Sequence, residues 1–288
     1  MKKIALLSCD SLEDFICYDD LLIEPFAEAG YLAEAVSWRS NAKWFDYEAV
    51  IVRSTWDYQD EPEAFLDTLK KIQVSSAALL NSLETMIWNL DKRYLEDLED
   101  KGVNIIPCKF AKEFNFELAM SIFQEYQCNE IIIKPTVSAN SDDTFRLGKE
   151  KLLESKESLS QLFSNRYHMY QPFVPSVVQN GEYSLFYFNG TFSHAILKTP
   201  KSGDFRVQEE HGGLLQSVEP SEELMSSANK VVGVIEPTPL YARIDLVEYD
   251  GQYALMEVEL IEPSLYFNLD KNSASRFVKA YEDSKKLL

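Results

Sequence analysis

Four charged side chains share one face of a β-hairpin that the segment ARIDLVEYDGQYALMEVEL predicts: Arg243, Asp245, Glu257 and Glu259. A three-residue turn at 250–252 would set Asp245 opposite Glu257. Arg243 would then face Glu259. A two-residue turn would shift the register by one residue and move Asp245 to the face away from Glu257, so the prediction depends on the length of the turn.

Three carboxylates around one point repel one another unless they share a hard cation. Mg²⁺ prefers oxygen ligands, keeps several waters and usually takes further ligands from substrate phosphates. The pattern therefore predicts that Asp245, Glu257 and Glu259 bind Mg²⁺, with Mn²⁺ as an alternative, next to a bound nucleotide. The other interpretation is a hydrated hairpin face on which Arg243 and Glu259 form a cross-strand ion pair.

Cations that could bind the phosphates of a nucleotide are spaced singly along the chain. Lys134 ends an apolar strand directly before Pro135, so its own strand would hold its ammonium group over a ligand. Three further candidates follow the same logic: Lys92, Lys198 and Arg206. Each alone is more typical of a surface side chain whose stem packs on apolar atoms. Their order relative to the carboxylates favours the ligand interpretation.

Composition restricts the partners of the protein. Among 288 residues, 28 Lys and Arg stand against 47 Asp and Glu, a formal charge of −19, which repels nucleic acid and anionic lipid. The apolar run after Lys3 is too short for a signal peptide, and no stretch is long enough to span a bilayer, so we expect a cytoplasmic protein. The four cysteines form no CxxC pair, which indicates reduced thiols.

The first part of the chain predicts a βαβ unit. KKIALLSCD is typical of a buried strand, YDDLLIEPFAEAGY of a helix ending near Gly30, and YEAVIVRSTWDY of a second strand with a polar tip. Ligands of open parallel sheets collect at such strand ends. Asp60 is placed to cap the helix that follows, and NSLETMIWNLDKRYLEDLEDKG predicts another helical stretch ending at Gly102. We place the first domain boundary at about residue 85.

Strand signals dominate the second half. The segment IIIKP predicts a strand that Pro135 ends, and a helix precedes it. From residue 167 onward the hairpin turn Asn189-Gly190 and the hairpin described above bracket one helix, in SEELMSSANKVVGVIE. Strands in runs, flanked by a few helices, indicate an α+β unit with an antiparallel sheet. The predicted fold class is thus α/β followed by α+β.

Taken together, these segments resemble the ATP-grasp ligases, in layout bacterial glutathione synthetase and the ligase that forms D-cycloserine. The resemblance rests on RSTWDY, NSLETMIWNLDKRYL, IIIKP, MYQPFVPSVVQNGEYSLFYFNG, LKTPKSGDFRVQEEHGG, RIDLV and MEVELIEPS, in that order over nearly the whole chain. It implies an ATP-grasp fold, in which two α+β subdomains clamp the nucleotide. Their expected bounds are 86–175 and 176–288, after an N-terminal βαβ domain at 1–85.

The same resemblance implies a role for each matching residue. Nucleotide contacts fall on Lys92, Lys134, Gln171, Phe173, Val174 and Glu182. Of these, Gln171, Phe173 and Val174 would border adenine. Catalytic charge stabilisation falls on Lys198 and Arg206, and metal binding on Asp245, Glu257 and Glu259. Substrate contacts fall on Arg53, Ser54, Thr55, His211, Gly212, Gly213 and Arg243.

Three departures from the family pattern limit what the resemblance implies. The lid segment TVSANSDDTF has no glycine, so hydroxyl groups of Ser138, Ser141 and Thr144 would have to replace backbone amides there. Ser184 stands where glutathione synthetases have Arg, which argues against glutathione synthesis. Glu259 replaces the usual Asn and adds negative charge at the metal.

The activity that this pattern predicts is a Mg·ATP-dependent ligase. It would convert the carboxylate of an amino-acid-like or peptide-like substrate to an acyl phosphate, which an amine displaces, releasing ADP and phosphate. The partners are small-molecule carboxylate and amine substrates, and a homo-oligomer stays open. Two alternatives remain: an ATP-grasp protein that binds nucleotide without ligase activity, and a hydrolase using Glu257 and Glu259. The hydrolase is disfavoured because residues two apart on one strand do not flank a scissile bond.

Overall fold

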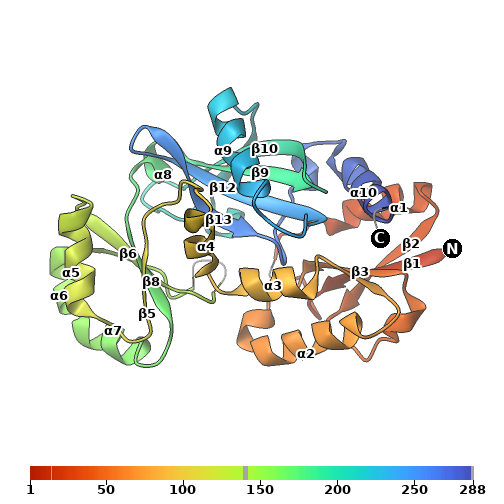
Figure 1. The fold of residues 1–288 in the computed structure, drawn as a ribbon, viewed down its shortest axis with the longest axis horizontal. Coiled ribbons are helices and arrows are strands. Elements are labelled where there is room, and N and C mark those ends of the chain that lie inside the picture. Colours follow the sequence, from red (N-terminus) through yellow and green to blue (C-terminus); the bar gives the residue numbers. More distant parts are fainter. Residues whose placement is uncertain (14, 139–141, 287–288) are drawn as a thin grey trace.

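The computed structural model describes residues 1–13, 15–138 and 142–286, and its strands form three sheets (Figure 1). The first sheet lies at the side of the molecule that holds both chain ends, the largest lies in the middle, and the third lies at the far side. The predicted lid residue Ser141 falls outside the described residues.

The first sheet is four-stranded and parallel, in the order β2-β1-β3-β4. Its strands are β1 (Lys2–Ser8), β2 (Tyr31–Ser37), β3 (Ala49–Ser54) and β4 (Ala78–Leu80). The predicted strands β1 and β3 are confirmed, and both are almost entirely buried because helices cover them. The strand β2 was not predicted. It lies at the sheet edge with only two of its seven residues buried, so its sequence lacks a continuous apolar run.

Helices around this sheet are shorter than the sequence predicts. The first predicted helix consists of a 3₁₀ turn (Asp19–Leu22) and α1 (Ile23–Glu28). Further 3₁₀ turns lie at Trp44–Asp46 and Tyr58–Asp60. The helix α2 (Pro62–Gln73) begins with proline, and its N-cap residue is Glu61, so the predicted cap at Asp60 is wrong.

The predicted helical stretch that ends at Gly102 is broken into two helices, α3 (Leu83–Leu90) and α4 (Tyr94–Asp100). Ser82 caps α3 by accepting a hydrogen bond from the backbone N–H of Thr85. Between the helices the backbone N–H of Lys92 donates to the carbonyl of Thr136 at 2.8 Å, which ties the break to the end of a strand of the third sheet. The break is therefore what positions Lys92.

The third sheet is antiparallel, in the order β5-β8-β6-β7. Its strands are β5 (Lys109–Ala111), β6 (Glu130–Pro135), β7 (Phe145–Gly148) and β8 (His168–Pro172). The helices α5 (Phe116–Glu125), α6 (Lys149–Glu154) and α7 (Lys156–Leu162) lie beside it (Figure 1). The predicted strand that ends at Lys134 and Pro135 is confirmed.

The central sheet is antiparallel, in the order β11-β10-β9-β12-β13. Its strands are β9 (Glu182–Phe188), β10 (Thr191–Thr199), β11 (Leu214–Ser217), β12 (Tyr241–Tyr249) and β13 (Gln252–Glu259). The helices α8 (Ser176–Gln179) and α9 (Glu222–Val232) are associated with it, and α9 packs apolar side chains on one face. The predicted Asn189-Gly190 turn is confirmed, because Phe188 pairs with Thr191.

The hairpin of β12 and β13 has the predicted pairs but not the predicted turn. Tyr249 pairs with Gln252, so the turn is Asp250-Gly251, with both residues at positive φ. This two-residue turn alone would separate Asp245 from Glu257. A bulge leaves Met256 without a pair and adds one residue to β13, so that Asp245 still lies opposite Glu257. The predicted three-residue turn is wrong, and the predicted pairing is confirmed.

The C-terminal helix α10 (Ser273–Ser284) joins the first sheet to the central one. Phe277 packs edge-on against Phe188 of the central sheet, and Tyr281 packs against Phe26 and Tyr31 beside the first sheet. These rings belong to one buried cluster that spans both sheets. A last 3₁₀ turn (Phe267–Leu269) precedes α10. Neither this turn nor α10 was predicted from the sequence.

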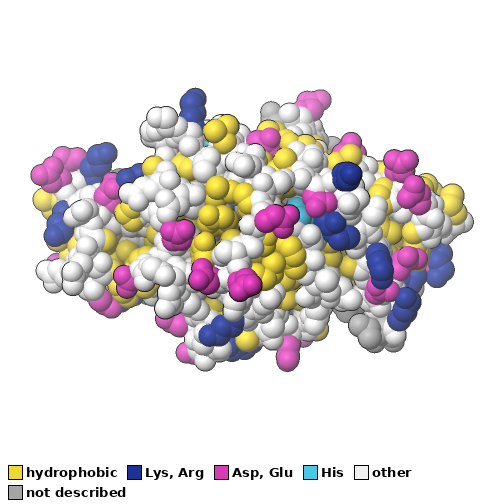
Figure 2. Space-filling view, turned by 90° about the horizontal axis from the view of Figure 1, so that it is seen from above, with side chains coloured by type: hydrophobic (Ala, Val, Ile, Leu, Met, Phe, Trp, Pro, Cys, Tyr) yellow, Lys and Arg dark blue, Asp and Glu magenta, His cyan; other side chains and the backbone are white. Residues whose placement is uncertain are grey.

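Acidic side chains are distributed over the surface. On the face drawn in Figure 2, Asp and Glu lie scattered among basic and apolar side chains. The four cysteines are free thiols. Within the described residues, no helix has the length and apolar character needed to cross a bilayer.

Candidate active site

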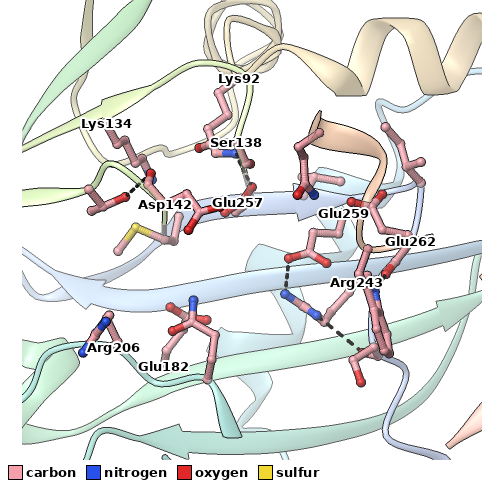
Figure 3. A pocket seen from close by; sticks show the side chains of 18 of the residues that line it. Lys92, Lys134, Ser138, Asp142, Glu182, Arg206, Arg243, Glu257, Glu259 and Glu262 are labelled. Atoms are coloured by element: carbon pink, nitrogen blue, oxygen red, sulfur yellow. Dashed lines mark hydrogen bonds and ion pairs between the residues drawn. The ribbon is translucent and has the colours of Figure 1, made fainter. Parts of the chain in front are cut away.

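A cavity of about 430 Å³ lies where the three sheets approach one another. Ten of the predicted site residues line it: Lys92, Lys134, Gln171, Phe173, Val174, Glu182, Arg206, Arg243, Glu257 and Glu259. Figure 3 shows Lys92, Lys134 and Glu257 at one end, Arg243, Glu259 and Glu262 at the other, and Glu182 and Arg206 across from them.

Asp245 lies just beneath this cavity and does not line it. Its carboxylate accepts hydrogen bonds from Ser184 Oγ at 2.5 Å and from Arg243 Nη2 at 2.9 Å, and Lys198 Nζ lies 3.3 Å away. Burial acts to raise the pKa of Asp245, but Arg243 and Lys198 outweigh it and lower that pKa to about 2. Asp245 is therefore a permanent anion under the cavity floor.

Lys198 is the buried cation of the same layer. Its ammonium group forms ion pairs with Glu182 and Asp245 and is almost inaccessible to solvent. Burial acts to lower the pKa of Lys198, but the two carboxylates raise it further than burial lowers it. Glu182 reaches the cavity, and burial raises its pKa despite Lys198.

Two lysines converge on Glu257 from outside the central sheet. Lys92 Nζ lies 3.0 Å from Glu257 Oε1 and donates to the carbonyl of Ser138 at 2.9 Å (Figure 3). Burial acts to raise the pKa of Glu257, but Lys92 and Lys134 lower it. Burial lowers the pKa of Lys134, and Glu257 partly offsets that effect. The predicted nucleotide lysines and the predicted metal ligand Glu257 thus meet at one end of the cavity.

Glu259 pairs with Arg243, as its position in the hairpin requires (Figure 3). Even so, burial together with the charges of Asp245 and Glu257 raises the pKa of Glu259 to about 7. Farther along the same wall, burial and the charge of Glu259 raise the pKa of Glu262 to about 8. This part of the cavity therefore has more carboxylates than cations to neutralise them.

The three predicted metal ligands do not meet at one point. Asp245 lies under the floor with Arg243 and Lys198, Glu257 turns to Lys92, and Glu259 pairs with Arg243. Over residues 1–13, 15–138 and 142–286 no group of three or more His, Cys, Asp or Glu side chains is arranged to hold a metal ion. The neighbouring cations explain the separation, because Lys92 draws Glu257 to one end while Arg243 and Lys198 hold Asp245 below and Arg243 also pairs with Glu259.

The predicted adenine border forms an apolar pocket. Phe173 and Val174 are buried and line the cavity, and Gln171 Nε2 lies 3.5 Å from the carbonyl of Ile106. Two residues that the sequence analysis missed complete it. The guanidinium group of Arg146 lies 3.7 Å from the centre of the Phe173 ring, and Phe205 packs edge-on against the same ring at 6.2 Å.

The loop after β10 contributes Arg206 and Phe205 to the cavity. Arg206 forms an ion pair with Asp204 at 2.7 Å, so its charge is already partly compensated. The predicted substrate residues His211, Gly212 and Gly213 belong to this loop but do not line the cavity. Gly213 is required by packing, because a Cβ atom there would lie 2.1 Å from the carbonyl oxygen of Val207.

The predicted substrate residues at the end of β3 are also buried away from the cavity. Arg53 is fully buried, donates to Asp19 Oδ1 at 3.0 Å and to the carbonyl of Pro263 at 2.8 Å. Ser54 and Thr55 are buried beside it. The residues that follow them reach the cavity instead: Trp56, Asp57, Tyr58, Gln59 and Asp60.

The loop that follows β13 holds the residues that the sequence analysis missed most clearly. Glu262, Ser264 and Tyr266 line the cavity, and Tyr266 has a positive φ of 45°, which is uncommon for a residue with a side chain. Trp56 Nε1 donates to the carbonyl of Glu262 at 2.8 Å and connects this loop to the first sheet. In the sequence, the segment IEPS directly after the predicted metal-binding strand was the only indication that this loop could belong to the site.

Comparison with known proteins places the chain among characterised relatives. Residues 4–81 match the family of the N-terminal domain of D-cycloserine synthetase DcsG. The sequence is 29% identical over 291 residues to the cycloserine biosynthesis protein DcsG of Streptomyces lavendulae, covering 96% of this chain and 97% of that protein. The crystal structure of D-cycloserine synthetase DcsG superposes with a TM-score of 0.86 at 27% identity, covering 98% of this chain and 99% of the other.

More distant solved structures share the fold. The D-alanine–D-alanine ligase of Bacillus anthracis, complexed with ATP, has a TM-score of 0.69 at 14% identity and covers 100% of this chain and 98% of its own. The ATP-grasp ligase PsnB, complexed with its minimal precursor, Mg and ADP, has a TM-score of 0.66 at 16% identity and covers 96% of each chain. The predicted fold class is confirmed.

Proposed function

We propose that the chain, an ATP-grasp ligase of the kind that forms C–N bonds, activates the carboxylate of a small substrate as an acyl phosphate. An amine of the same or a second molecule then displaces the phosphate. The observation that carries this proposal is the convergence of Lys92 and Lys134 on Glu257 inside one cavity. A cyclic or linear amide would result, depending on where the amine resides.

Oxygen donors in the cavity fit Mg²⁺ chemically. Glu257 and Glu259 offer hard carboxylate oxygens, and the raised pKa of Glu259 marks negative charge that Arg243 does not neutralise. With the triphosphate supplying further oxygen ligands, these two residues would hold the ion, and Asp245 would add negative charge from below. Bound Mg²⁺ would neutralise charge on the β- and γ-phosphates. The ATP-grasp ligase PsnB, which shares the fold, was solved with Mg and ADP, and this supports Mg²⁺ as the ion.

The cavity offers a separate group for each part of ATP. Phe173 and Val174, with Gln171, would border adenine in the apolar pocket. Glu182 would lie near the ribose. Lys92 and Lys134 would bind the phosphates, because they reach the cavity from outside the central sheet.

The chemical steps need positioning and charge rather than a protein nucleophile. An oxygen of the substrate carboxylate attacks the γ-phosphorus, and ADP leaves with the electron pair of the bond to the bridging oxygen. The amine nitrogen then attacks the acyl carbon, phosphate leaves, and the nitrogen loses a proton. Arg206 and Arg243 line the cavity where these negative charges develop, and Lys198 supports them from beneath through Glu182 and Asp245.

A protein that binds nucleotide without ligase activity is the second candidate. The pairing of Arg206 with Asp204 favours it, because a cation needed for phosphoryl transfer is already compensated. Under this candidate Mg·ATP would raise the unfolding temperature, but no carboxylate would release phosphate from it.

The test is to incubate the protein with Mg·ATP, hydroxylamine and a panel of amino acids and small carboxylic acids. Hydroxylamine traps an acyl phosphate as a hydroxamate, so the proposal expects a hydroxamate and an equal amount of ADP. The appearance of AMP in place of ADP would contradict the acyl-phosphate mechanism. ATP binding without any hydroxamate would favour the second candidate.

A further inference from the structure

The cations at the cavity floor and walls account for three carboxylates that line the cavity and for Asp245 beneath it. Glu182 pairs with Lys198, Asp245 with Arg243 and Lys198, Glu257 with Lys92, and Glu259 with Arg243. Those pairs use Lys92, Lys198 and Arg243, and Lys134 adds a further positive charge beside Glu257. Four carboxylates therefore lie with four cations.

Glu262 is the half-buried carboxylate left without an ion pair, whereas Asp60, Asp142 and Glu210, which also line the cavity, are exposed. It lines the same cavity and is half-buried, and within the described part of the chain no Lys, Arg or His lies close enough to form an ion pair with it. The hydroxyl of the buried Tyr58 lies near its carboxylate and acts to lower its pKa. The raised pKa of Glu262, about 8, follows from burial and the adjacent charge of Glu259. Such a carboxylate is stabilised by any cation that enters the cavity.

The position of Glu262 is fixed by its backbone. Trp56 Nε1 donates to its carbonyl at 2.8 Å, and the ring of Trp56 packs on Phe15 at 5.4 Å. Phe15, Trp56 and Tyr58 all line the cavity. Glu262 thus shares the cavity with aromatic side chains, and an aromatic ring can also attract a cation.

We propose that Glu262 binds the ammonium group of an amino-acid substrate, so that the enzyme selects amino acids over carboxylic acids that lack an amine. This inference deepens the proposed ligase function and rests on it. The substrate carboxylate would point toward Arg243 and the γ-phosphate, and its ammonium group toward Glu262. Arg243 and Glu262 lie at the same end of the cavity (Figure 3).

An ammonium group fits this position better than a metal ion does. A divalent ion requires several oxygen ligands around one point. The proposed Mg²⁺ ligands Glu257 and Glu259 would be completed by the triphosphate, whereas among residues 1–13, 15–138 and 142–286 no group of three or more His, Cys, Asp or Glu side chains is arranged to hold an ion at Glu262. An ammonium group needs two or three acceptors and tolerates aromatic neighbours. The carboxylate of Glu262 and the hydroxyl of Tyr58 supply those acceptors.

The test compares matched substrate pairs with hydroxylamine as a common nucleophile. Each pair consists of an amino acid, in either enantiomer, and the acid that lacks its amine, such as alanine and propionate. The wild-type enzyme should form hydroxamate faster from the amino acid. Glu262→Gln should reduce that preference by roughly ten- to hundredfold, because a charged hydrogen bond is replaced by a neutral one, and should leave KM for ATP unchanged.

Two further variants show whether the effect belongs to Glu262. Tyr58→Phe removes the hydroxyl that contacts Glu262 and should reduce the preference only a few-fold. Glu210→Gln removes another carboxylate that lines the cavity but is exposed, and should leave the preference unchanged. An equal loss in Glu210→Gln would show a general charge effect and would overturn the assignment.

A binding experiment decides the inference without turnover. With Mg²⁺ and the non-hydrolysable analogue AMP-PNP, the preferred amino acids should raise the unfolding temperature of the wild type but not of Glu262→Gln. Equal shifts in both proteins, or no shift from any amino acid, would overturn the proposal. If amino acids bind selectively but no hydroxamate forms, the proposed ligase function fails while the binding assignment stands.

Discussion

Asp245 lies opposite Glu257 in the register of β12 and β13, but the two carboxylates face different surroundings. Asp245 is 3% exposed and closed in by Arg243 and Lys198, whereas the side chain of Glu257 is 27% exposed and lines the cavity. One strand pair thus supplies a buried structural anion and an accessible one. The two positions should respond differently to loss of charge.

Glu257→Gln should abolish ATP consumption and leave the fold intact. The side chain stays partly hydrated, so the free energy of unfolding should change by about 1 kcal/mol or less, while turnover falls by roughly a hundredfold or more. Phosphate release and chemical denaturation measure the two quantities. Near-normal turnover in this variant would contradict the assignment of Glu257 to the nucleotide and metal site.

Asp245→Asn should lose stability as well as activity. Removing this charge leaves Arg243 and Lys198 buried with less compensation, which costs about 3–5 kcal/mol for a buried ion pair. Denaturation in urea would show a lower midpoint with an unchanged slope. If Asp245→Asn were as stable as Glu257→Gln, the buried network would not be structural.

Stability without ligands should fall as pH rises from about 4.5 to about 8. The pKa of Glu262 is raised to about 8 and that of Glu259 to about 7, so both carboxyl groups bind protons more tightly in the folded protein than in the unfolded chain. Their contribution is fully present below the unfolded value and is lost as pH passes the folded values. Unfolding temperatures of wild type and Glu262→Gln, measured in EDTA from pH 5 to pH 9, should diverge in favour of the variant at high pH. A constant difference across that range would refute the shift.

Phe205→Ala should weaken ATP binding specifically. Phe205 packs on Phe173 at the adenine end, and Arg146 covers the same ring, so the variant opens one side of the apolar pocket. An aromatic pair contributes about 0.5–1.5 kcal/mol beyond its buried area, so KM for ATP should rise several-fold or more. Phe192→Ala serves as a control, because Phe192 packs on Tyr187 away from the cavity. An equal rise in the control would point to general destabilisation.

Arg53→Met should destabilise the protein, and adding Asp19→Asn should restore part of the loss. Arg53 is fully buried against Asp19 and the carbonyl of Pro263, so the single variant leaves Asp19 without its cation and should cost about 3 kcal/mol. The double variant removes that uncompensated charge. If Arg53 instead binds substrate, the double variant should stay inactive although its stability recovers, which activity and denaturation measurements together distinguish.

Local sequence signals were sufficient where one segment both forms and ends an element. Lys134 could be predicted because an apolar run leads to it and Pro135 follows. The pairs of the acidic hairpin were predicted correctly although the turn was not, since the bulge at Met256 compensates for the shorter turn. Bulges depend on tertiary packing, so no local pattern could have revealed it.

Residues that act through distant contacts could not be predicted. Glu262 gains its surroundings from Trp56 and Tyr58, which follow β3 of the first sheet. Arg146 meets Phe173 only because two strands of the third sheet bring them together. Arg53, Ser54 and Thr55 follow the rule that strand ends carry ligand contacts. Here all three are buried, and Arg53 donates to the carbonyl of Pro263. Residues 56–60 line the cavity in their place.

The packing of α10 also has a consequence for synthesis on the ribosome. Phe277 and Tyr281 complete the cluster that covers β1 and α1, so the first sheet keeps an open apolar side until α10 has been translated. The N-terminal segment emerges first but cannot finish folding first. A nascent chain arrested before residue 273 should therefore be captured by chaperones that bind exposed apolar surface, and release should coincide with the arrival of that helix.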